Sequence, residues 1–151
     1  MNNKIFKTTR ELTPFITDMI KRGKSVNITV TGNSMFPLFA DTRDTALISK
    51  SDKYKRLDII LYLRDNGDLV LHRIVKKKKG IYHLCGDNQL TIEYPIYENQ
   101  IIGKVVSFVR KGKNVKTSNI FYILYSYFWC LNIKLRKPLM KYALKARGLI
   151  K

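Results

Sequence analysis

The chain is poor in the residues that cross-link small proteins or bind metals, with only two cysteines and two histidines among its 151 residues. Cys85 and Cys130 are too few for a disulfide framework. Together with the scattered histidines they also lack the spacing of a structural zinc site. We therefore expect no metal and no other cofactor. The length fits one domain with a hydrophobic core of its own.

The first 13 residues lack the apolar run that a cleavable signal peptide or an N-terminal membrane anchor requires. Acidic residues are missing from the end of the sequence, where the last one is Glu98 and residues 99–151 hold 12 Lys or Arg. This part carries most of the net charge of +18, whereas residues 1–98 are nearly balanced. A basic platform beside an ordinary domain attracts anionic lipid headgroups or nucleic acid.

Hydrophobic periodicity predicts an N-terminal helix followed by a β-rich domain. The helix is expected over about 9–23, because apolar residues repeat at helical spacing until Gly23. Asn66-Gly67 and the run Lys76–Gly80 each predict a tight hairpin. Residues 25–110 are interpreted as a coiled, mostly antiparallel β-core. The strands are expected over 25–31, 45–49, 58–64, 68–75, 80–85 and 101–110.

Residues 117–133 contain no charged residue and are rich in aromatic side chains. A stretch of this length is at the lower limit for crossing a bilayer, and a basic amphipathic tail follows it. The pattern favours a membrane-surface element over 117–151 that binds anionic lipid. The alternative is a helix packed on the β-core. Nucleic acid is disfavoured, because the aromatic residues cluster apart from the charges.

Ser34 has the sequence setting of a nucleophile, because it follows a predicted strand in a sharp Gly- and Pro-containing turn. Gly32 permits a tight turn there, and backbone N–H groups of the turn can point at a developing oxyanion. His72 shares a strand face with branched aliphatic residues, which favours the neutral imidazole that a general base requires. Asp87, in the turn after the next strand, is a candidate to orient the ring. Each residue alone is more often structural.

Five blocks give these residues a context, and their order resembles the S24/S26 serine peptidase superfamily of signal peptidases and LexA-like autoproteases. The blocks are Gly32–Pro37, Leu57–Tyr62, Leu71–Val75, Gly86–Gln89 and Ile102–Val106. The resemblance covers about 30–110 and implies a mainly β, coiled antiparallel domain with an N-terminal helix and a C-terminal helical, basic segment. On this basis we divide the chain into a peptidase domain over 1–115 and a tail over 116–151.

The resemblance implies peptide hydrolysis by acyl transfer, with Ser34 at the nucleophile position and His72 at the base position. Lysine is the base in the common bacterial signal peptidases and LexA-like proteins. Histidine is the base in the endoplasmic-reticulum, archaeal and sporulation-type signal peptidases, in which Asp87 has a matching aspartate. The Ser34 backbone N–H is the implied oxyanion donor, whereas Gly32 cannot supply the second, hydroxyl donor of some relatives. The residues implied to lie at the substrate are Met35, Phe36 and Pro37.

Three functions remain open after this comparison. The first is a membrane-associated, signal-peptidase-like serine endopeptidase that cleaves exported or modified precursor peptides. The sequence shows no transmembrane helix ahead of Ser34, which argues against the housekeeping preprotein substrate. The second is an inactive S24/S26-like module that binds a membrane surface or nucleic acid. The third is a LexA-like autoproteolytic regulator, which the short segment before Ser34 and the presence of His72 disfavour.

Overall fold

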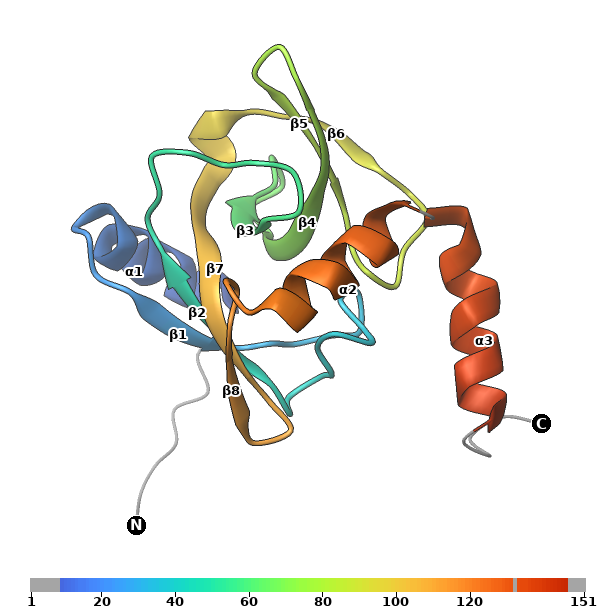
Figure 1. Cartoon of the computed structure of the whole chain (residues 1–151). Helices are drawn as coiled ribbons and strands as arrows, with labels where there is room; N and C mark the ends of the chain where they lie inside the picture. The colour runs from blue at the N-terminus through green and yellow to red at the C-terminus, as the bar shows by residue number, and fades with distance from the viewer. Residues whose placement is uncertain (1–8, 132, 147–151) are drawn as a thin grey trace.

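The computed structural model describes residues 9–131 and 133–146. One helix comes first, a run of strands follows, and two helices end the described chain (Figure 1). The helices are α1 (Thr9–Lys21), α2 (Ile120–Leu131) and α3 (Arg136–Ala146), with 3₁₀ turns η1 (Glu98–Gln100) and η2 (Ile133–Leu135). The strands are β1 (Val26–Thr29), β2 (Thr45–Ser49), β3 (Ile59–Leu63), β4 (Leu69–Lys78), β5 (Ile81–Cys85), β6 (Glu93–Ile96), β7 (Ile101–Arg110) and β8 (Lys113–Lys116).

The strands form one antiparallel sheet in the order β1-β2-β7-β3-β4-β5-β6, and β8 pairs with β7. Register shifts interrupt four of the pairings, namely β2 with β7, β3 with β7, β4 with β5, and β5 with β6. Such irregularities bend strands and increase their twist, so the sheet coils on itself. The predicted fold class, a mainly β, coiled antiparallel domain with an N-terminal helix and C-terminal helices, is confirmed.

The individual elements follow the hydrophobic periodicity closely, with informative exceptions. The two predicted hairpins form: Arg64 N–H donates to the Asp68 carbonyl at 2.9 Å, and Lys79 and Gly80 have φ of 48° and 77°. Strand β4 is longer than predicted and continues through exposed lysines to Lys78. Strands β6 and β8 were not predicted, since both are short and β6 contains Pro95.

Successive residues of β4 face two different cores. Leu71 packs against a core that α1 closes with Ile16 and Ile20. Ile74 belongs to a second core built mainly from β3, β5 and β6. Each fully buried aliphatic or aromatic side chain stabilises the fold by about 1.5–3 kcal/mol. His72 is on the same side of β4 as Ile74, because side chains alternate along a strand.

Helix α2 packs one side against the sheet and crosses it in Figure 1. Its buried residues are Tyr122, Ser126, Trp129 and Cys130. The Tyr122 ring lies 5.4 Å from the Phe108 ring of β7, centroid to centroid. None of the helices in the described part of the chain is long and apolar enough to cross a membrane. One side of the uncharged segment is thus packed on the β-core, as in the alternative given above. Its membrane role stays a prediction. Residues 147–151 of the tail lie outside the described residues.

Candidate active site

The turn that carries Ser34 is anchored on both sides of the serine. Gly32 has φ of 77°, a left-handed conformation that favours glycine, and its N–H donates to Asp41 Oδ1 at 2.8 Å. Met35 and Phe39 are 1% and 0% exposed, and both belong to the core under α1. Ser34 itself is half-buried. These contacts therefore hold the turn in place, with the serine at the surface.

The loop after β5 holds the Ser34 backbone. Asn88 N–H donates to the Ser34 carbonyl at 2.8 Å, and Asn88 Nδ2 donates to the Asn33 carbonyl at 3.1 Å. Gly86 is required here, because a Cβ at this position would lie 2.5 Å from the Ser34 carbonyl oxygen. Within residues 9–131 and 133–146, no acceptor bonds the Ser34 N–H and no partner bonds its Oγ. Both groups thus remain available to a substrate.

His72 is connected to a carboxylate through a tyrosine. The imidazole is 1% exposed, and its Nδ1 lies 3.3 Å from Tyr62 Oη. Tyr62 uses its only proton to donate to Glu93 Oε2 at 2.7 Å, so the tyrosine oxygen must accept from His72. Nδ1 therefore carries the ring proton, and Nε2 is left with the lone pair that a base needs. Glu93 Oε1 also lies 3.2 Å from Nδ1.

The surroundings of His72 and Glu93 lower the pKa of both side chains. Burial lowers the pKa of His72 to about 4, against the nearby Glu93 charge, which raises it. Burial alone would raise the pKa of Glu93, but hydrogen bonds from Arg64 and Tyr62 outweigh it and hold that pKa below its ordinary value. Arg64 makes two contacts with the carboxylate, one of them from Nε at 2.9 Å. At neutral pH the imidazole is neutral and the carboxylate is ionised.

Asp87 has a different position from the one predicted for it. Its carboxylate receives Arg73 Nε at 2.9 Å and Arg73 Nη2 at 2.7 Å, and both side chains are 0% exposed. Tyr125 Oη donates to Oδ2 at 3.2 Å. Arg73 follows His72 on β4 and therefore points to the opposite side of the strand. In the described structure Asp87 thus makes no hydrogen bond to His72, and Glu93 occupies the predicted place beside the ring.

The C-terminal helices hold the loop that contains Asp87. Trp129 Nε1 of α2 donates to the Asp87 carbonyl at 2.8 Å. Arg136, at the start of α3 and 1% exposed, donates from Nη1 to the Gly86 carbonyl at 2.9 Å and from Nε to the Trp129 carbonyl at 3.0 Å. Because the same loop bonds Ser34, these contacts connect both helices to the turn that carries Ser34.

The predicted substrate residues separate into two groups. The Met35 side chain is part of the core, so it is not exposed to a substrate in this structure. Phe36 and Pro37 are half-buried, and Arg110 fixes this segment by donating to the carbonyls of Pro37 at 3.1 Å and Leu38 at 2.8 Å. Phe36 and Pro37 therefore remain the candidates for substrate contact.

Ser34 Oγ and the His72 ring are not joined by a direct hydrogen bond in the described structure. Unliganded hydrolases often hold nucleophile and base beyond hydrogen-bond distance until substrate binds. What the two residues share is the loop after β5: Asn88 bonds Ser34, and the charge of Asp87 is close enough to raise the pKa of His72.

Sequence reasoning missed Tyr62, Arg64 and Glu93. The sequence held a signal for the first two. Tyr62 and Arg64 are two residues apart in the predicted strand 58–64, which precedes the strand of His72, so their side chains point to the same side. Glu93 is the only acidic residue between Asp87 and Glu98, but it falls between the predicted strands 80–85 and 101–110. Its approach to His72 depends on strand β6, whose pairing was not predicted.

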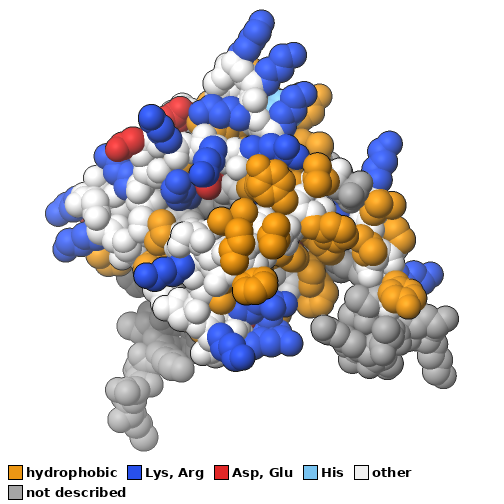
Figure 2. All heavy atoms as spheres, viewed as in Figure 1, with side chains coloured by type: hydrophobic (Ala, Val, Ile, Leu, Met, Phe, Trp, Pro, Cys, Tyr) orange, Lys and Arg blue, Asp and Glu red, His pale blue; other side chains and the backbone are white. Residues whose placement is uncertain are grey.

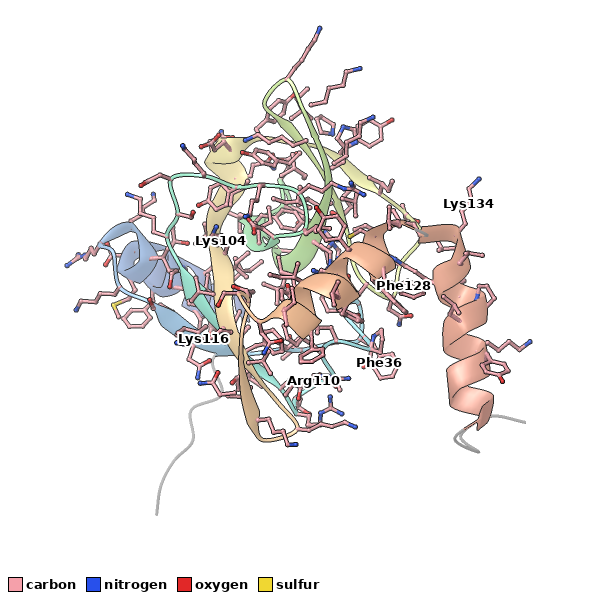
Figure 3. The ribbon with its side chains drawn as sticks, viewed as in Figure 1. Phe36, Lys104, Arg110, Lys116, Phe128 and Lys134 are labelled. Atoms are coloured by element: carbon pink, nitrogen blue, oxygen red, sulfur yellow. The ribbon has the colours of Figure 1, made fainter. Side chains whose placement is uncertain are left out.

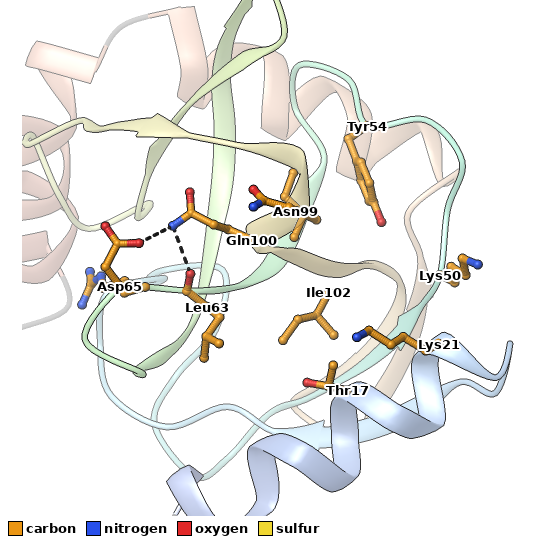
Figure 4. Close-up of a pocket in the computed structure, with 11 residues that line it drawn as sticks. Thr17, Lys21, Lys50, Tyr54, Leu63, Asp65, Asn99, Gln100 and Ile102 are labelled. Atoms are coloured by element: carbon orange, nitrogen blue, oxygen red, sulfur yellow. Dashed lines mark hydrogen bonds between the residues drawn. The ribbon is translucent and has the colours of Figure 1, made fainter.

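Two hollows in the surface are each lined by one residue of the group around His72, Glu93 in the first and Arg64 in the second. One, with a volume of about 350 Å³, borders Glu93 and the loop after β5; it is lined by Asn88, Gln89, Leu90, Thr91, Glu93 and Lys137. The other, of about 450 Å³, lies between α1 and the ends of β3 and β7 (Figure 4). There Gln100 Nε2 donates to the Leu63 carbonyl and to Asp65 Oδ1, and Arg64 is part of the lining. Neither hollow is lined by Ser34 or His72. The first hollow contains Glu93 in its lining together with Asn88, which bonds the Ser34 backbone.

A family model described as Peptidase S24-like matches residues 3–106, which is more than half of the chain. The matched range contains Ser34, His72, Asp87 and Glu93. No match was found among curated protein sequences.

Proposed function

The chain belongs to the S24-like peptidase family, and on that premise we propose that it is an active serine endopeptidase with Ser34 as nucleophile and His72 as general base. The proposal joins the family fold with the arrangement of His72, Tyr62 and Glu93. It assigns the orienting role to Glu93, where the sequence had suggested Asp87.

In the acylation step, Ser34 Oγ attacks the carbonyl carbon of the scissile peptide bond while His72 Nε2 accepts the hydroxyl proton. The carbonyl oxygen becomes an oxyanion, to which the Ser34 backbone N–H donates. When the intermediate collapses, the C–N bond breaks and the imidazolium gives its proton to the leaving amine. The products of this half-reaction are the released amine peptide and an acyl-enzyme ester.

In the deacylation step, His72 Nε2 takes a proton from water while the water oxygen attacks the ester carbon. Collapse of this second intermediate returns the proton to Ser34 Oγ and releases the carboxylate peptide. The imidazolium exists only transiently in both steps. Glu93 stabilises it, because its Oε1 lies 3.2 Å from Nδ1 and remains ionised through Arg64.

The single observation that carries the proposal is the direction of the hydrogen bonds around His72. Tyr62 donates to Glu93 and must therefore accept from Nδ1, which leaves the lone pair on Nε2. The relay fixes one tautomer, as a catalytic base requires.

The substrates we propose are exported or modified precursor peptides. An extended peptide would contact Phe36 and Pro37 at the catalytic turn, next to the hollow that Glu93 borders. Strand β6 is the last strand of the sheet and lies beside this hollow, so its free edge can pair with a substrate backbone.

Cleavage of a peptide library by the parent protein, Ser34→Ala, His72→Ala and His83→Ala tests the proposal. His83 is the matched control, because it is the other histidine and stacks on Tyr94 away from the relay. We expect the first two variants to lose at least ~10³-fold in kcat/KM and the control to keep its activity. Cleavage that survives in Ser34→Ala contradicts the mechanism. Absence of cleavage in the parent, together with absence of acylation at Ser34, would favour the inactive membrane-surface or nucleic-acid-binding module.

A further inference from the structure

Helix α2 exposes one apolar side to solvent while its other side packs on the sheet. No charged residue occurs in Ile120–Leu131. The outward side chains, called the α2 face below, are Ile120 (59% exposed), Phe121 (78%), Leu124 (57%), Tyr127 (52%), Phe128 (55%) and Leu131 (64%). In Figure 2 hydrophobic side chains form a continuous band over this helix. A contiguous apolar patch of this kind marks an interaction surface.

Lysines flank both ends of the α2 face. They form what is called the basic rim below: Lys111, Lys113 and Lys116 around the β7–β8 hairpin, and Lys134, Lys137 and Lys141 in η2 and α3, all exposed. Figure 3 shows Lys116 and Lys134 beyond the two ends of α2, with Phe128 between them. No acidic residue follows Glu98 in the sequence, so no carboxylate of this segment offsets the rim.

We propose that the α2 face docks on the surface of an anionic lipid bilayer, with the basic rim against the headgroups. The twelve residues of α2 extend roughly 18 Å, too short for a hydrocarbon core of about 30 Å. The helix therefore lies in the plane of the interface, where aromatic side chains and flanking lysines are both favoured.

The charges favour lipid over a second copy of this chain. Two copies that met through their α2 faces would bring two basic rims together, and the protein carries +18 overall. An anionic bilayer offers apolar depth to the face and negative headgroups to the rim at the same time. Nucleic acid matches the rim but offers no apolar depth for Phe121 and Leu124.

Docking in this orientation would place the catalytic turn at the bilayer surface. The buried side of α2 contacts the loop after β5 through Tyr125 and Trp129, and that loop bonds Ser34. Phe36, in the same turn as Ser34, is on the face of the molecule that carries Phe128 in Figure 3. A substrate held at the membrane could then reach Ser34; this consequence, unlike docking itself, rests on the proposed function.

Flotation with phosphatidylcholine vesicles, with or without phosphatidylglycerol, tests docking directly in the full chain. We expect the parent to float with the anionic vesicles. The double variant Phe121→Ser/Phe128→Ser should lose at least ~10-fold in partition coefficient, because two exposed aromatic rings no longer enter the bilayer. Phe15→Ser is the matched control, since Phe15 is 61% exposed on α1 and outside the α2 face.

The basic rim is tested with charge-neutralising variants. Lys116→Gln/Lys134→Gln should weaken binding to the anionic vesicles about tenfold and leave the weaker binding to neutral vesicles unchanged. Added salt should lower the binding of the parent and have less effect on this variant. Lys78→Gln/Lys79→Gln is the control, because these exposed lysines lie on the β4–β5 hairpin away from α2.

The proposal is overturned if the parent does not bind anionic vesicles, or if Phe121→Ser/Phe128→Ser binds them as well as the parent does. If the parent is a dimer that does not bind vesicles, and Phe121→Ser/Phe128→Ser is a monomer, the α2 face would be assigned to self-association instead. Ser34→Ala should bind vesicles like the parent. A parent that cuts peptides but ignores vesicles refutes docking alone, and a parent that binds vesicles without Ser34-dependent cleavage refutes the peptidase proposal alone.

Discussion

Replacing Glu93 by glutamine removes the negative charge at the end of the hydrogen-bond chain that begins at His72 Nδ1. Glutamine keeps the size of the side chain, but it cannot stabilise the imidazolium that forms during acylation. Loss of such assistance to a general base lowers kcat by ~10²–10⁴-fold. The pKa of His72 should also fall further, because the Glu93 charge raises it in the parent.

The stability of Glu93→Gln should change little. Arg64 and Glu93 are partly exposed, with side-chain exposures of 34% and 24%, and exposed ion pairs contribute only about 1 kcal/mol or less. The hydrogen bond from Tyr62 adds about 1 kcal/mol. The variant should therefore remain folded at assay temperature while its activity is lost.

Asp87→Asn is the matched comparison, and the structure predicts the reverse pattern. Both members of the Arg73–Asp87 pair are 0% exposed, so the substitution leaves a buried guanidinium without its counter-charge. Breaking a buried pair in this way lowers the free energy of unfolding by about 3–5 kcal/mol. For a chain of this size, that loss lowers the Tm by roughly 10 °C.

The assay is kcat/KM on one peptide substrate, with urea and thermal unfolding of the same preparations. At a temperature where each variant is folded, Asp87→Asn should keep kcat/KM within about tenfold of the parent, because the relay from His72 to Glu93 is intact. If Asp87→Asn loses activity as severely as Glu93→Gln and loses no stability, then Asp87 is the orienting residue and the relay has been misassigned.

Three further predictions concern pH and the turn that carries Ser34. Because burial lowers the pKa of His72 to about 4, the acid limb of kcat/KM should lie near pH 4; a limb near 6.5 would show an exposed base. An unfolded histidine takes up its proton near pH 6.5, so the contribution of His72 to the free energy of unfolding should fall by about 3 kcal/mol as the pH drops from 6.5 to 4. His72→Gln should remove this part of the pH dependence in urea unfolding. Gly86→Ala should lower kcat ~10²-fold, because its Cβ must displace the Ser34 carbonyl oxygen 2.5 Å away; unchanged kinetics would show that the position of the turn is not critical.

The sequence predicted the β-core well because its strands alternate in hydrophobicity and its hairpins carry the expected turn residues. The loop between β5 and β6 was harder. Two acidic residues, Asp87 and Glu93, follow β5 within a short distance, and periodicity cannot decide which one reaches His72. Which carboxylate reaches His72 depends on the β5–β6 pairing and on Arg73. Arg73 points away from His72 and donates two hydrogen bonds to the Asp87 carboxylate.

The uncharged segment was predicted to be either a membrane-surface element or a helix packed on the β-core. The sequence did not show which of its side chains would be buried and which exposed. Ser126 and Trp129 are buried because Arg73 and Asp87 offer them hydrogen-bond partners across the fold. Phe121 and Phe128 have no such contacts and remain exposed. Long-range partners of this kind leave no periodic trace in a sequence, so only the structure distinguishes the packed side from the α2 face.

The proposed activity depends on the activation of the Ser34 nucleophile by His72. It is tested most directly by treating the parent, Ser34→Ala and His72→Ala with a panel of serine-acylating probes, followed by peptide mass spectrometry. We expect one covalent adduct on Ser34 in the parent, none in Ser34→Ala, and a labelling rate at least ~10²-fold lower in His72→Ala. Equal labelling of the parent and His72→Ala, or an adduct on another residue only, would contradict it.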